Sequence, residues 1–221
     1  MEHVDVVWPD GDESVVRFAD RDWRVKASAE PVGPGPNRFS AGNVSVDRAG
    51  RLSLSIAPTT TGWSCAEVIG VGHFGYGTYT WTLTSDVESF EPPTVLGLFT
   101  WSDDPAQANR ELDIEFSRWG SRTSPVRGGF TVQRSHPHPP VTETFTPGRG
   151  RSEHTLAWSA GRARFRSTFG PVLREWTYSG PDVPTPGGAV APRMNLWLFR
   201  GASLTRPVTI VVDSFTYLPA Q

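Results

Sequence analysis

Short apolar runs separated by proline and glycine recur along the whole chain. The 20 prolines and 22 glycines of the 221 residues fall largely between these runs. No amphipathic helical stretch longer than about three turns interrupts the pattern, and no strand–helix–strand rhythm is present. The sequence therefore predicts an all-β fold in which two antiparallel sheets pack face to face as a β-sandwich.

The expected strands number about a dozen, and the segments between them are short and rich in turn residues. None of these segments resembles an interdomain linker, and no internal repeat is visible, so residues 1–221 are expected to form a single domain. The predicted strands are 15–18, 39–46, 52–56, 65–71, 77–83, 95–101, 111–116, 129–133, 142–145, 154–158, 162–168, 194–199 and 208–217.

The segment RELDIEF carries a carboxylate at every second position. Successive side chains of a strand point to opposite faces, so Glu111, Asp113 and Glu115 are predicted to share one face. The apolar residues between them share the other face. The pattern predicts a strand with its apolar side in the core and its acidic side at the surface.

Three crowded carboxylates raise the cost of ionising one another, so at least one of them should keep its proton near neutral pH. Glycoside hydrolysis uses two such groups, one to protonate the leaving oxygen and one to attack the sugar or activate water. A simpler interpretation is that the acids only line a solvated sheet face. The motif alone leaves both interpretations open.

The formal net charge of −2 gives no electrostatic argument for nucleic acid or an anionic membrane as a partner. The chain contains one lysine, Lys26, against twenty arginines, which a compositional bias of the genome explains. One cysteine, Cys65, excludes an internal disulfide and is predicted to be a buried thiol. The first residues lack the apolar stretch of a secretion signal, and no apolar run is long enough to span a membrane. We expect a soluble protein whose compartment stays open.

His136 and His138 lie in a proline-rich stretch without a third ligand at a familiar spacing, so we interpret them as part of a surface turn and predict no metal site. The nine tryptophans can fill the core or serve as platforms for sugar rings. If the acidic strand continues, Trp119 emerges on the acidic face. Trp101, at the end of its own strand, is a second candidate platform.

Together with ELDIEF, several segments resemble the family 16 glycoside hydrolases, which include lichenases, laminarinases, agarases and carrageenases. The similar segments follow one another in the family's order from about residue 37 onward and cover most of the chain. They are FSAGNVSVDRAGRLSL, CAEVIGVGHFGYGTYTWTL, VLGLFTW, MNLW and the terminal VVDSFTY. The resemblance implies the concanavalin A-like jelly roll of this family.

The resemblance also implies roles for the acids: Glu111 as nucleophile, Glu115 as general acid/base and Asp113 as a supporting carboxylate. Residues four apart on a strand lie about 13 Å apart at Cα, whereas a retaining pair of carboxyl groups needs about 5 to 5.5 Å. The strand is therefore expected to curve, with both glutamates leaning across Asp113.

Further positions resemble sugar contacts of lichenase-like members, namely Glu67, Asn195 and Trp197. Together with Trp101 and Trp119 they are the predicted substrate-binding residues. The chain departs from lichenases in that Asn109 and Arg110 replace a tryptophan–acid pair before the first glutamate. The specificity of the relatives is therefore not transferable.

The resemblance implies an endo-acting, retaining hydrolase that cleaves a polysaccharide or oligosaccharide of the β-glucan or galactan type. A transglycosylase on the same fold and a non-catalytic, lectin-like carbohydrate-binding protein are the alternatives. No cofactor is expected, although a structural calcium occurs in parts of the family and only Asp213 offers a ligand for one. We expect the protein to act as a monomer.

Overall fold

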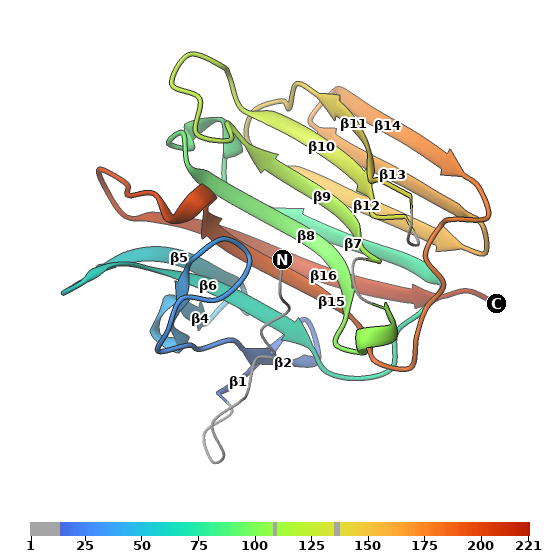
Figure 1. Cartoon of the computed structure of the whole chain (residues 1–221), viewed down its shortest axis with the longest axis horizontal. Coiled ribbons are helices and arrows are strands. Elements are labelled where there is room, and N and C mark those ends of the chain that lie inside the picture. Colours follow the sequence, from blue (N-terminus) through green and yellow to red (C-terminus); the bar gives the residue numbers. More distant parts are fainter. Residues whose placement is uncertain (1–13, 108–109, 135–137) are drawn as a thin grey trace.

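The computed structural model describes residues 14–107, 110–134 and 138–221 and forms a sandwich of two antiparallel sheets (Figure 1). The predicted all-β sandwich is confirmed. The front sheet, which faces the viewer in Figure 1, consists of β11 (Val141–Phe145), β10 (Arg127–Val132), β9 (Leu112–Ser117), β8 (Thr94–Ser102), β15 (Val190–Leu198), β6 (Gly62–Gly70), β2 (Arg21–Val25) and β1 (Val15–Phe18), in this spatial order.

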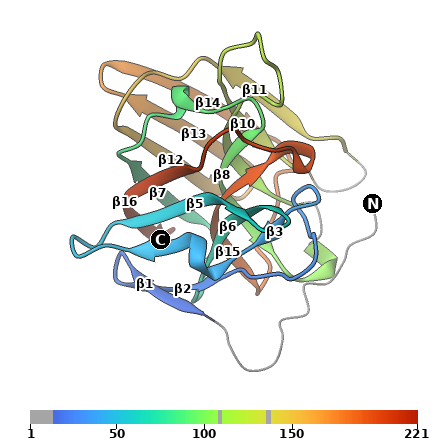
Figure 2. The same ribbon diagram turned by 90° about the vertical axis from the view of Figure 1, so that its left-hand side faces the viewer.

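The back sheet packs behind it. It consists of β14 (Val172–Ser179), β13 (Arg162–Phe169), β12 (Ser152–Ser159), β7 (Gly77–Leu83), β16 (Val208–Pro219), β5 (Leu52–Thr59) and β4 (Val44–Val46). The two sheets join where the ends of β5 and β6 pair, beside the short parallel strand β3 (Arg38–Phe39), as Figure 2 shows. Among the described residues, single 3₁₀ turns connect strands at η1 (Ala41–Asn43), η2 (Val87–Ser89), η3 (Pro105–Gln107) and η4 (Phe199–Gly201).

The core lies between the sheets, and β9 contributes its predicted apolar face to it. Leu112, Ile114 and Phe116 are all fully buried. The Phe116 ring meets Phe169 of the back sheet edge-on, with 6.1 Å between ring centroids. This packing fixes the orientation of β9, because a shift of one residue would turn its acidic side chains into the core. The Cys65 thiol is buried as predicted.

The segment 39–46 was predicted as one strand, and this prediction was wrong. The chain turns at η1, where the Ser40 side chain accepts a hydrogen bond from the backbone of Gly42. The Asn43 amide then donates to the backbone oxygens of Ser64 and Cys65 at 2.8 and 3.1 Å and holds the turn against β6. Capping by Ser40 and the buried Asn43 amide replace strand pairing at this point.

Two strands of the structure, β2 and β14, were absent from the sequence prediction. In β14, exposed and half-buried residues alternate along the edge of the back sheet, and none of its side chains is fully buried. In the described part of the chain, no helix combines the length and the apolar character needed to cross a membrane.

Candidate active site

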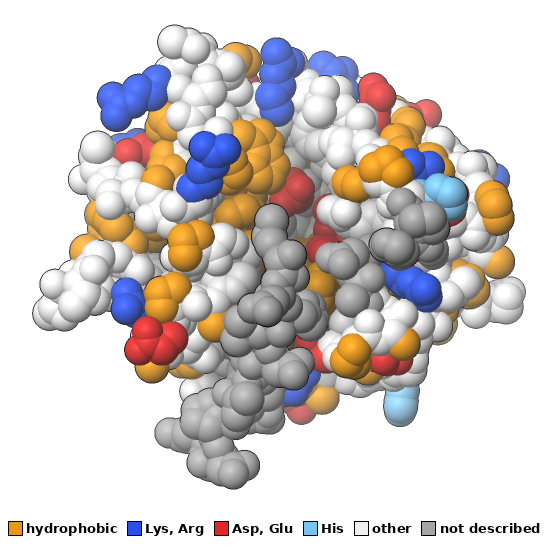
Figure 3. Space-filling view, in the orientation of Figure 1, with side chains coloured by type: hydrophobic (Ala, Val, Ile, Leu, Met, Phe, Trp, Pro, Cys, Tyr) orange, Lys and Arg blue, Asp and Glu red, His pale blue; other side chains and the backbone are white. Residues whose placement is uncertain are grey.

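The acidic side of β9 lies on the outer face of the front sheet, here called the front face. β9 sits between β8 and β10, which pair with it along its whole length. Asp113 is only 4% exposed, whereas Glu111 and Glu115 on either side of it are partly exposed. Figure 3 shows acidic side chains at the base of a hollow in this face. Asp113 and Glu115 are two residues apart on β9 and alternate with its buried apolar residues, so they share the outer face of the strand as predicted.

Glu115 has a glycine beside it on each neighbouring strand, Gly97 on β8 and Gly129 on β10. The two glycines place no side chain of their own beside Glu115. Beyond Gly97 in the same row lie Asn195 on β15 and Glu67 on β6. The Asn195 side chain occupies the space into which a side chain at position 97 would extend.

Burial raises the pKa of the carboxyl groups of Asp113 and Glu115 on β9 and of Glu111, the residue before this strand. The pKa of Glu111 rises to about 7, mainly because burial withdraws the carboxylate from water, and the negative charge of Glu115 adds to the rise. Burial also raises the pKa of Glu115 to about 7. The pKa of Asp113 is raised well above its usual range by burial and by the charges of both glutamates. Near neutral pH the cluster therefore holds protons that exposed acids would have lost.

A hydrogen bond between Asp113 and Glu111 divides these protons unequally. It lowers the pKa of Glu111 and raises that of Asp113. These opposite pKa shifts fit a protonated Asp113 whose O–H donates a hydrogen bond to the ionised Glu111 carboxylate. The Gln133 side chain is the second hydrogen-bonding partner of Asp113, and the Gln133 backbone N–H donates to the Glu111 carbonyl oxygen at 2.9 Å.

A buried ion-pair network lies two strands from the acids. Glu67 is 1% exposed. Its carboxylate accepts hydrogen bonds from Lys26 Nζ at 3.0 Å and from Arg193 Nη1 at 3.2 Å. Arg193 Nη2 donates to Asp103 Oδ1 at 2.5 Å. Glu67, expected from the resemblance to contact sugar, thus has both oxygens bound to cations of this chain.

The predicted tryptophans surround the acids from two sides. Trp101 is on the front face near the end of β8, where the register that pairs Thr100 with Leu112 places it next to Glu111. Trp119 is 41% exposed, and its ring packs edge-on against Trp197, with 6.2 Å between ring centroids.

Trp119 reaches this place by a turn and not by the expected continuation of the strand. β9 ends at Ser117, whose Oγ donates to the Thr94 carbonyl oxygen and accepts from the Trp119 N–H, at 2.9 and 2.8 Å. Trp119 itself has a left-handed backbone with φ of 49°. Its ring also contacts Phe199, at 5.5 Å between centroids.

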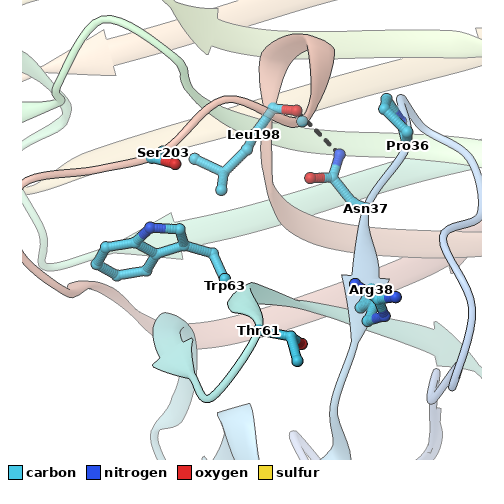
Figure 4. Close-up of a pocket in the computed structure, with 9 residues that line it drawn as sticks. Pro36, Asn37, Arg38, Thr61, Trp63, Leu198 and Ser203 are labelled. Carbon is cyan, nitrogen blue, oxygen red and sulfur yellow. Dashed lines mark hydrogen bonds between the residues drawn. The ribbon is translucent and has the colours of Figure 1, made fainter.

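A separate cavity of about 190 Å³ lies at the end of the sandwich near η4 (Figure 4). The Asn37 amide donates across it to the Leu198 carbonyl oxygen at 2.9 Å. Its lining residues are Pro36, Asn37, Arg38, Thr61, Gly62, Trp63, Leu198, Gly201 and Ser203. Glu111, Asp113 and Glu115 do not line this cavity, so it is distinct from the candidate catalytic group.

Sequence reasoning missed Arg193 and Lys26 as members of the site. Both are more than nine-tenths buried, and their shared partner Glu67 lies far from them in the sequence. A buried charge needs a partner of opposite sign, but the sequence does not indicate which strand supplies it. Two residues of earlier interest, Asn109 and His136, lie outside the described residues.

The chain matches no protein-family model and no curated protein, but many solved structures resemble it. A β-glucanase of Bacillus licheniformis superimposes with a TM-score of 0.66 and 17% identity over 96% of this chain and 100% of that one. A pseudo-β-1,3-glucanase of Mycobacterium tuberculosis gives a TM-score of 0.68 and 18% identity, over 90% and 91%. A family 16 endo-glucanase of Bacteroides ovatus gives 0.63 and 13%, over 89% and 94%. The chain therefore has the fold of the family 16 glycoside hydrolases.

Proposed function

We propose that the protein belongs to this family and is an endo-acting, retaining glycoside hydrolase that cleaves a β-linked polysaccharide of the glucan or galactan type. The observation that carries the proposal is the row of three acids on the front face, in which the pKa of each carboxyl group is raised. Sugar binding alone does not require three crowded, desolvated carboxyl groups. A two-step hydrolysis does require one ionised and one protonated carboxyl at the same pH.

In the proposed reaction the ionised Glu111 attacks the anomeric carbon while Glu115 donates its proton to the leaving glycosidic oxygen. The C–O bond breaks, and the sugar becomes bound to Glu111 as an ester. Glu115, now ionised, takes a proton from a water that attacks the same carbon, which releases Glu111 and restores the proton on Glu115. The hydrogen bond from Asp113 stabilises the charge on Glu111 before the attack.

The first experiment measures the release of reducing ends from β-glucans, galactans, their sulfated forms and xyloglucan. The wild type is compared with Glu111→Gln, Glu115→Gln and the control Glu153→Gln, which changes an exposed acid of the back sheet. Either front-face variant should lower turnover by at least about a thousandfold, whereas the control should leave it unchanged. A front-face variant that kept full activity would contradict the assignment.

The two glutamates can be told apart by azide. With an activated substrate, azide should replace the nucleophile in Glu111→Ala and give an α-glycosyl azide. In Glu115→Ala it should instead attack the glycosyl-enzyme and give a β-glycosyl azide. The reverse stereochemistry would exchange the two roles. Products longer than the starting oligosaccharide would identify a transglycosylase instead.

A non-catalytic carbohydrate-binding protein is the second candidate. It is favoured by the two cations that occupy the Glu67 carboxylate and by the similarity to a structure described as a pseudo-glucanase. Calorimetric binding of one polymer, with no release of reducing ends from any of them, would establish this function. Release that disappears in Glu111→Gln would exclude it.

A further inference from the structure

Arg193 is placed so that its charge acts on one of the two glutamates. On the front sheet it lies opposite Phe99 of β8, which in turn lies opposite Asp113 of β9. Neighbouring strands are about 4.8 Å apart, so the Arg193 backbone is about 10 Å from that of Asp113. An extended arginine side chain covers only part of this distance, and the contacts of the guanidinium with Trp101 and Asp103 place its charge near β8, between β15 and β9.

The contacts of Arg193 show which way its side chain runs. The guanidinium carbon lies 5.8 Å from the centre of the Trp101 ring, and Nη2 donates to Asp103. The register of β8 and β9 places Trp101 next to Glu111, so these two contacts lie toward the Glu111 end of the acidic row. The third contact, from Nη1 to Glu67, lies on β6, on the far side of β15 from the acids. Glu115 is at the other end, in the row of Gly97.

The guanidinium is held in place on several sides. Its side chain is 9% exposed, and Nη1 and Nη2 donate to Glu67 and Asp103. Lys26 fixes Glu67 from the other side. Among the described residues, the buried Nε atom of Arg193 has no hydrogen-bond partner. A network of this kind leaves the charge little freedom to move away from the acids.

The charged groups near Glu111 lie on β9, β6 and β15 and in the segment that follows β8. Thr131 on β10 and Gln133, the residue after β10, carry no charge. The charged or ionisable groups are Asp113 and Glu115 on β9, Glu67 on β6, Arg193 on β15 and Asp103 after β8. The charge of Arg193 lowers the pKa of Glu111, whereas burial raises the pKa of Glu115.

We propose that Arg193 is a positioning residue that makes Glu111, and not Glu115, the carboxyl group that ionises first. This inference rests on the proposed function, for which it supplies the device that separates nucleophile from acid. Apart from the hydrogen bond between Asp113 and Glu111, little else distinguishes the Glu111 and Glu115 carboxyl groups, which are both withdrawn from water. A fixed cation near one of them breaks this symmetry without touching the sugar.

The test titrates the side-chain carboxyl groups by carbon NMR in protein with labelled glutamate. Resonances of Glu111 and Glu115 are assigned from their loss in Glu111→Gln and Glu115→Gln. In the wild type, Glu111 should ionise at lower pH than Glu115. In Arg193→Gln, the midpoint of Glu111 should rise by roughly one pH unit while that of Glu115 stays nearly unchanged.

Arg193→Lys keeps the charge and should hold the midpoint of Glu111 close to its wild-type value. Arg166→Gln, which removes an exposed arginine of the back sheet, is the matched control. An unchanged Glu111 midpoint in Arg193→Gln, or equal shifts of both glutamates, would overturn the inference. If Arg193→Gln does not fold, the wild-type order decides, because ionisation of Glu115 before Glu111 contradicts the proposal.

Where hydrolysis is measured, the acidic limb of kcat/KM against pH should move upward in Arg193→Gln with the Glu111 midpoint, while the alkaline limb stays in place. A loss of folding or packing alone would lower both limbs without moving either. The titration does not require activity. A protein that hydrolyses nothing but shows the expected midpoints would refute the proposed function and leave the role of Arg193 intact.

Discussion

Asn195 leans over Gly97 so closely that a Cβ atom at position 97 would lie 2.5 Å from the Asn195 Oδ1 atom. A Cβ atom does not approach a non-bonded atom this closely, so a side chain at position 97 would push Asn195 aside. Within the described part of the chain, Oδ1 of Asn195 is buried and has no hydrogen-bond partner. Because it has no side chain, Gly97 allows the Asn195 Oδ1 acceptor to lie in the same cross-strand row as Glu115.

The first prediction uses the two glycines that flank Glu115. Gly97→Ala should lower turnover by about tenfold or more, because the methyl group displaces the Asn195 amide. Gly129→Ala is the matched control, since its Cβ would meet only a methyl carbon of Thr142 at an ordinary 3.5 Å. It should keep activity within about twofold. Equal losses of kcat/KM in both variants would show that the position of the Asn195 amide does not contribute to turnover.

The second prediction concerns stability against pH. Glu115 holds its proton to about pH 7 in the folded protein, whereas the ordinary value is 4.5. Its contribution to the free energy of unfolding is thus fully present below pH 4.5 and is lost as the pH rises through 7. Urea unfolding of the wild type and Glu115→Gln at pH 4.5 and pH 8 should show this. The wild type should lose about 1 to 3 kcal/mol more than the variant over this range.

The third prediction separates a structural role of Glu67 from sugar binding. Glu67→Gln leaves the buried Lys26 without its counter-charge and removes one of the two carboxylates that Arg193 contacts, which should lower the free energy of unfolding by about 3 to 5 kcal/mol. Glu175→Gln breaks a half-exposed pair with Arg164 and should cost less than about 1 kcal/mol. A Glu67→Gln protein with unchanged stability and a raised KM would instead support direct sugar contact.

The fourth prediction tests Trp119 as a sugar platform. Its exposed ring is held by edge-on contacts with Trp197 and Phe199. Trp119→Ala should raise KM by roughly fivefold, the effect of about 1 kcal/mol of lost ring contact, while kcat changes less. Leu218→Ala, at a residue 66% exposed on β16, is the control. An unchanged KM would leave the ring with only a packing role.

The acidic row was predictable because it is a local property. The alternation of Glu111, Asp113 and Glu115 with apolar residues fixes which side chains share a face as soon as the segment is a strand. Burial of Phe116 in the core then sets which face is outside. Residues two apart in the sequence are therefore sufficient to predict which side chains share a face.

The electrostatic surroundings of the row were not predictable in the same way. Arg193 meets Glu67 across 126 residues of sequence, and only the order of β6, β15, β8 and β9 in the sheet brings it near Glu111. The strand β14 was missed for another reason. It lies at a sheet edge, so few of its side chains are buried and its hydrophobic signal is weak.

The buried network also gives the protein a chemical reporter. Lys26 is the chain's one lysine and is 5% exposed, with Nζ bound to Glu67 and to the Gly33 carbonyl oxygen. Acylating reagents that modify lysine side chains therefore have no accessible target of this type in the folded state. A mass increase at the Lys26 peptide would time the opening of the network beneath the front face, with no label introduced by mutation.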